Sequence, residues 1–138
     1  MDISKMIREE VEMLKKHGWL MHAVPASQYD GVHANYHTHG VFESWSHMDF
    51  QITLDMNPIM AHSIIEVAVE NVKEGFRYGN NKVYDNILVG MPVMMKVFFE
   101  CDREVMRIVL PNKKGEIPSR TDGDVFSRQL DDYNFDAV

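Results

Sequence analysis

One strongly marked helix separates two stretches of strand-like pattern, and this arrangement constrains the fold more than any other feature. Asn57 is a residue that caps helices well, and Pro58 at the first helical position loses no needed hydrogen-bond donor. Apolar residues then recur at helical spacing until Gly75 ends the helix: Ala61, Ile64, Ile65, Ala68 and Val72. A single long helix among strands predicts an α+β domain rather than a bundle or an all-β fold.

Strands are expected on both sides of this helix, and a second helix at the start of the chain. The first helix covers residues 3–17, with Asp2 or Ser4 as its cap and Gly18 at its end. The predicted strands are residues 19–24, 32–42, 50–55, 76–78, 82–84, 87–89, 93–100 and 105–110. Residues 124–133 are expected to form a short polar helix. We therefore predict a mostly antiparallel sheet with two main helices packed on one of its faces.

The length and charge of the chain exclude several classes of protein. Its 138 residues suit one domain, residues 1–138, of which 131–138 are expected to be a frayed acidic tail. With 14 Lys and Arg against 21 Asp and Glu, the net charge of −7 argues against a nucleic-acid binder. No apolar run approaches the roughly 20 residues that span a bilayer, so no membrane partner is expected.

Two further features bear on location and on partners. Cys101 is the only cysteine, which excludes an intrachain disulfide and suits a reducing, cytoplasmic location. Its acidic neighbours would raise the pKa of the thiol, so a nucleophilic role is not expected. The segment 93–99 is apolar on both strand faces and the chain has 11 methionines, which together predict a central strand and a homo-oligomer or another protein partner.

The histidines are concentrated in a region without fixed positive charge. All seven lie between positions 17 and 72, which contain no Lys or Arg but carry six acidic residues. A site built from this stretch would offer imidazole and carboxylate groups, which suit a cation better than a phosphate.

Within this region His37 and His39 are two residues apart, so on a strand their side chains share a face. His47 and Asp49 follow in the next connection and could return to the same place. We predict a divalent metal site, for an ion such as zinc, at His37, His39, His47 and Asp49. Two alternatives stay open, a polar small-ligand or acid–base site and histidines that serve only to hydrogen-bond the fold.

Several motifs occur in a fixed order along the chain. They are Gly18-Trp19, Tyr36-His37-Thr38-His39-Gly40, Ser46-His47-Met48-Asp49-Phe50, Val72-Lys73-Glu74-Gly75 and Pro111-Asn112-Lys113-Lys114-Gly115-Glu116-Ile117-Pro118, with Gln129 near the end. Over about residues 17–130 the chain resembles a bacterial family with an HTHG stretch, the domain-of-unknown-function family 4262, in which Asp often stands at the position of Asn112. The resemblance implies no activity. It implies that the shared, ligand-binding feature is His37, Thr38, His39, Gly40 and His47.

Two hypotheses about function follow. In the first, the chain is a small binding domain whose site lies around His37, His39 and His47; if it is an enzyme, metal-assisted hydrolysis or acid–base chemistry is the expected class. In the second, it is a small acidic inhibitor or immunity-type protein that acts by binding another protein, without catalysis. No complete catalytic motif is present, so the sequence assigns no reaction.

Overall fold

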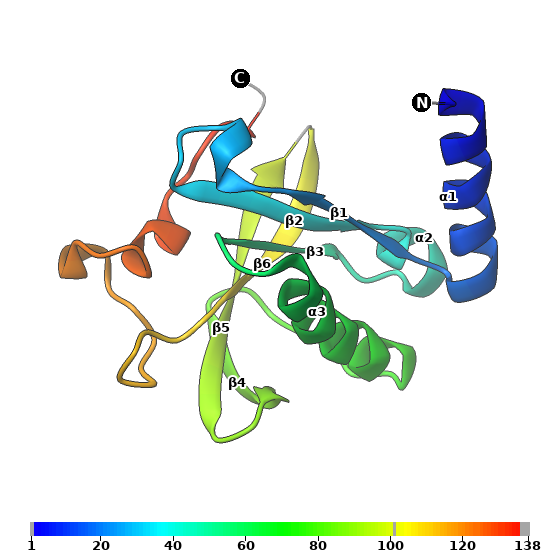
Figure 1. Ribbon diagram of the computed structural model, residues 1–138. Helices are drawn as coiled ribbons and strands as arrows, with labels where there is room; N and C mark the ends of the chain where they lie inside the picture. The colour runs from blue at the N-terminus through cyan, green and yellow to red at the C-terminus, as the bar shows by residue number, and fades with distance from the viewer. Residues whose placement is uncertain (1, 101, 136–138) are drawn as a thin grey trace.

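The fold is a six-stranded sheet whose two halves meet at one parallel pair of strands. In the computed structural model, which describes residues 2–100 and 102–135, the strand order is β1-β2-β3-β6-β5-β4. The strands are β1 Leu20–Val24, β2 His33–His39, β3 Asp49–Leu54, β4 Lys82–Leu88, β5 Met91–Glu100 and β6 Arg103–Val109. Only β3 and β6 pair in parallel, and the other four pairs are antiparallel (Figure 1). The predicted α+β class is confirmed.

The long helix α3, Pro58–Lys73, covers one face of the sheet and forms the core with it (Figure 1). Asn57 caps it as predicted, since its side chain accepts a hydrogen bond from the backbone N–H of Ile59. Its fully buried residues Ile65 and Ala68 belong to the same core as Phe50 and Ile52 of β3 and Met95 of β5.

The opposite face of the sheet carries a row of polar side chains from five strands. Cross-strand partners run His22, His37, Gln51, Arg107 and Lys96. Arg107 is buried, and its guanidinium lies 3.6 Å from the ring centre of Phe98. The same group donates to the carbonyl oxygens of residues 129 and 131, so the C-terminal segment covers this part of the row.

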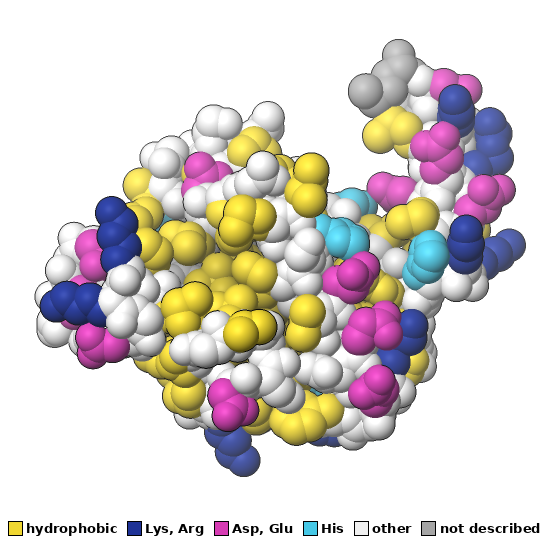
Figure 2. Space-filling view, turned by 60° about the horizontal axis from the view of Figure 1, so that its bottom comes forward, with side chains coloured by type: hydrophobic (Ala, Val, Ile, Leu, Met, Phe, Trp, Pro, Cys, Tyr) yellow, Lys and Arg dark blue, Asp and Glu magenta, His cyan; other side chains and the backbone are white. Residues whose placement is uncertain are grey.

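The first helix, α1 (Ile3–His17), stands apart from the sheet. Asp2 caps it, and Gly18 ends it with a φ of 81°. Of the apolar residues spaced along this helix, Leu14 is half-buried near its end, whereas Ile7 and Val11 are exposed. Figure 2 shows α1 as an arm that projects from the body of the protein. The helix therefore joins the fold mainly at its C-terminal end.

The strand predicted over residues 32–42 ends at His39, and a short helix, α2 (Val41–Trp45), replaces its last residues and most of the connection that follows. Gly40 precedes it with a φ of 101°, and a Cβ atom there would lie 2.5 Å from the backbone oxygen of Gly18. Only glycine meets both conditions, so Gly40 is required by the backbone.

Three further expectations need correction. Residues 76–78 do not form a strand; Tyr78 is buried among aromatic rings, so packing rather than strand pairing holds this segment. The predicted strands 82–84 and 87–89 are parts of one strand, β4, with irregular pairing between Tyr84 and Leu88. In place of a helix over 124–133 there is one short 3₁₀ helix, Ser127–Leu130, and another, Arg120–Asp122, precedes this range. Cys101 and the tail residues 136–138 lie outside the described residues.

Candidate functional site

Three histidines of the first two strands converge on the face of the sheet opposite α3. His22, His37 and His39 each offer a ring nitrogen, and these three atoms lie within 4.8 Å of one another. The ring centres are 5.4 Å apart for His22 and His37, 4.8 Å for His22 and His39, and 5.0 Å for His37 and His39. Among the described residues, these three histidines form the one group of His, Cys, Asp or Glu side chains that could hold a metal ion.

The strand register brings these rings together. His37 and His39 are alternate residues of β2, so their side chains leave the same face. His22 is the direct partner of His37 in the antiparallel β1–β2 pair, and directly opposite residues share a face. The predicted pair His37 and His39 is therefore joined by His22, which was not among the predicted site residues.

A buried carboxylate and an arginine stand behind the imidazole cluster. Oε1 of Glu100, at the end of β5, lies 3.5 Å from Nδ1 of His37, and that nitrogen is buried without a hydrogen bond. Glu100 also accepts hydrogen bonds from Asn35 and from the guanidinium of Arg103. Arg103 lies in β6, and it brings to the cluster a fixed positive charge that residues 17–72 lack.

Burial and nearby positive groups keep the rings of His37 and His39 neutral. Burial, together with the positive potential of His39, Arg103 and His22, lowers the pKa of His37 from 6.5 to about 4, against the opposing effect of Glu100. Burial and the neighbouring Arg103 and His22 also lower the pKa of His39. Both rings are therefore unprotonated at neutral pH, which is the form that binds metal ions.

His47 does not join the cluster. Its Nδ1 donates to the carbonyl oxygen of Met48 at 2.8 Å, and its Nε2 accepts from the backbone N–H of Tyr78 at 3.2 Å. Both ring nitrogens are thus used in linking two backbone segments. Burial lowers the pKa of His47, which suits this neutral, structural arrangement.

Asp49 likewise lies outside the cluster and organises the backbone around β3. Its carboxylate accepts from the hydroxyl of Thr38 at 2.6 Å and from the backbone N–H groups of Val41 and Phe42 at the start of α2. It also pairs with Arg103 at 3.4 Å. These contacts use the carboxylate as a cap and an ion-pair partner, and Asp49 is not in the group of side chains that could hold a metal ion.

Thr38 and Gly40, the other members of the predicted ligand set, have backbone-fixing contacts. Thr38 is fully buried, and its hydroxyl accepts from the backbone N–H of Phe50 while donating to Asp49. Gly40 allows the close approach to Gly18 described above. Within the HTHG stretch, His37 and His39 therefore belong to the imidazole cluster, whereas Thr38 and Gly40 hold the end of β2 in place.

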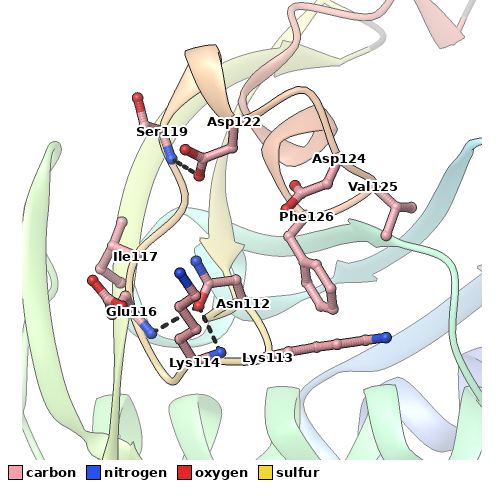
Figure 3. A pocket seen from close by; sticks show the side chains of 10 residues that line it. All are labelled: Asn112, Lys113, Lys114, Glu116, Ile117, Ser119, Asp122, Asp124, Val125 and Phe126. Carbon is pink, nitrogen blue, oxygen red and sulfur yellow. Dashed lines mark hydrogen bonds between the residues drawn. The ribbon is translucent and has the colours of Figure 1, made fainter.

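A separate cavity lies away from the histidines. It has a volume of about 700 Å³ and is formed by the loop of residues 112–126 (Figure 3). Two of its lining carboxylates are engaged in local turns, since Asp122 accepts from the N–H of Ser119 and Asp124 accepts from the N–H of Ser127. The cavity contains none of the predicted site residues.

A comparison with protein families decides the relationship that the motifs suggested. A family profile described as a domain of unknown function (DUF4262) matches residues 13–108, well over half of the chain. The chain belongs to this family. The matched range contains His22, His37, His39 and Glu100. Membership of DUF4262 assigns no activity, and no curated protein or solved structure matched the chain.

Proposed function

We propose that this protein binds a divalent transition-metal ion through His22, His37 and His39. The observation that carries the proposal is the convergence of three imidazole nitrogens within 4.8 Å. Imidazole is a preferred ligand for zinc, copper and nickel, and zinc sites in proteins are built from three or four protein ligands.

The protonation states support the proposal. A metal ion competes with protons for a histidine nitrogen, so a lowered pKa removes that competition at neutral pH. The pKa values of His37 and His39 are both lowered. The buried, unbonded Nδ1 of His37 is a polar atom that the protein itself leaves without a hydrogen bond, 3.5 Å from Glu100.

The local charge also favours a cation. Arg103 is the fixed positive group beside the cluster, and it is paired with both Asp49 and Glu100 at 3.4 and 3.3 Å. Glu10 lies against His22 on the other side. The carboxylates of Glu10, Asp49 and Glu100 outnumber the single guanidinium, so a bound divalent ion would offset the net negative charge of the site.

Zinc titration of the untagged protein tests the proposal. We expect one Zn²⁺ per chain by calorimetry, and His37→Gln or His39→Gln to weaken binding by at least about 10-fold, the lower limit for loss of even an outer-shell partner. His17→Gln is the matched control, because His17 is an exposed histidine outside the cluster.

Two results would contradict the proposal. One is the absence of zinc binding by a protein that is folded by circular dichroism. The other is zinc binding that His37→Gln and His17→Gln weaken equally, which would place the ion somewhere else on the chain.

A second candidate function, binding of a partner protein, rests on exposed apolar side chains. Large apolar side chains gather on the face shown in Figure 2. On α3 and the β4–β5 hairpin, Ile59 is 77% exposed and Val89 is fully exposed. Such surfaces are typical of interaction sites. Co-purification of a stoichiometric partner that is lost in Ile59→Lys but kept in His37→Gln would support this function over metal binding.

A further inference from the structure

Helix α1 is held to the rest of the protein by few contacts along its length. It is 15 residues long, close to the limit of about 12–15 residues below which isolated helices are marginal in water. A crevice of about 250 Å³ separates it from β1, lined by Met6, Glu10 and Met13 on the helix and by Met21 and His22 on the strand side. The helix therefore needs a further contact to be fixed in its position beside the sheet.

Glu10 bridges this crevice to the imidazole cluster. Its Oε1 lies 3.0 Å from Nε2 of His22, and the two side chains are 48% and 40% exposed. Among the described residues, this is the side-chain hydrogen bond by which α1 reaches the sheet. An exposed pair of this kind adds little stability in water, so by itself it would not hold the helix.

We propose that Glu10 is the fourth ligand of the ion held by His22, His37 and His39, and that ion binding fixes α1 against β1. The inference rests on the proposed function. Two ligands of a tetrahedral ion with bonds of about 2.0–2.1 Å lie about 3.3 Å apart, close to the 3.0 Å that separates Glu10 from His22. Glu10 contacts His22 but stands outside the group of ligand atoms that lie within 4.8 Å of one another, so its carboxylate would turn toward the ion as α1 is drawn against β1. Three imidazoles and one carboxylate would then complete a four-coordinate shell.

The other acidic residues in this part of α1 have different surroundings. Glu9 also lines the crevice, but its carboxylate lies 4.0 Å from the ammonium group of Lys5, one turn earlier on the helix. Glu12 lines a different hollow, together with Lys16 and His17. Glu12 therefore provides a matched control: Glu12→Gln makes the same change of charge and size on the same helix without touching the site.

Zinc calorimetry and hydrogen–deuterium exchange of the full chain test the inference. In the wild-type protein, saturating Zn²⁺ should slow amide exchange in the peptide covering residues 3–17. Glu10→Gln should weaken zinc binding by at least about 10-fold and should abolish the slowing in α1 even at saturation. Glu12→Gln should behave like the wild type in both measurements.

The outcomes separate this inference from the function on which it rests. If Glu10→Gln binds zinc as tightly as the wild type and α1 exchanges at the same rate with and without the ion, the fourth-ligand inference is overturned while the three-histidine site stands. If the wild-type protein binds no zinc, both are overturned.

Discussion

Substitution of Thr38 tests whether the hydrogen-bonded unit at the end of β2 holds the two strands together. Thr38→Val keeps the shape of the side chain but removes its hydroxyl. The change deletes a hydrogen bond to the carboxylate of Asp49, worth about 1.5–3 kcal/mol, and leaves the N–H of Phe50 without its acceptor, at a further cost of about 1–3 kcal/mol. We expect the free energy of unfolding to fall by about 3–5 kcal/mol.

The same substitution at Thr53 is the control. Thr53 is also buried in a neighbouring strand, but its hydroxyl oxygen has no hydrogen-bond partner. Because a buried hydroxyl without a partner is unfavourable, Thr53→Val should be neutral or should stabilise the protein by up to about 1–2 kcal/mol.

Urea unfolding followed by tryptophan fluorescence measures both variants, since Trp19 lies in the core. The expected pattern is a large loss of stability in Thr38→Val and none in Thr53→Val. Equal effects of the two substitutions, or a loss below about 1 kcal/mol at Thr38, would refute the reasoning that these two bonds stabilise the end of β2.

Three further predictions concern pH, backbone geometry and the C-terminal segment. The pKa of His37 is about 4 in the folded protein and ordinarily 6.5, so the unfolded chain binds more protons between these pH values. The free energy of unfolding should therefore be highest above about pH 6.5 and should fall toward pH 4. His37→Gln should flatten this part of the melting-temperature profile. Gly40→Ala should destabilise the protein more than Gly75→Ala, because both glycines have φ near 100° but only Gly40 has a backbone oxygen in the place of the new Cβ; equal losses in urea unfolding would contradict this steric argument. His33→Ala removes the contacts of the two ring nitrogens with Asp131 at 2.8 Å and with Asp30 at 2.5 Å. Limited proteolysis should then release the C-terminal segment faster, and unchanged cleavage would count against this role.

Local chemistry made the two main helices predictable. Asp2 and Gly18 enclose α1, and Asn57 with Pro58 begins α3, because capping depends on residues within one turn of the helix end. The strand interpretation failed at Tyr78, whose aromatic character favours a strand. Its position is set instead by rings from distant parts of the chain, such as Phe50.

The candidate site could be predicted only in part. His37 and His39 share a face because of strand periodicity, which is visible in the sequence. His22 becomes their neighbour only through the β1–β2 register, and the eight-residue connection between these strands leaves that register open. Arg103 and Glu100 arrive from the far half of the sheet, so no pattern around the histidines could indicate them.

The single parallel pair of strands has a consequence for how the protein folds. β1, β2 and β3 follow one another in the sequence and in the sheet, as do β4, β5 and β6, so each half can form from contacts that are close along the chain. Joining β3 to β6 pairs Asp49 with Val105 and must close a much longer loop, which makes the joint the expected slow step. The three imidazoles belong entirely to the first half. A bound ion would therefore act on the early hairpin, before Glu100 and Arg103 arrive, and would raise the folding rate as well as the final stability.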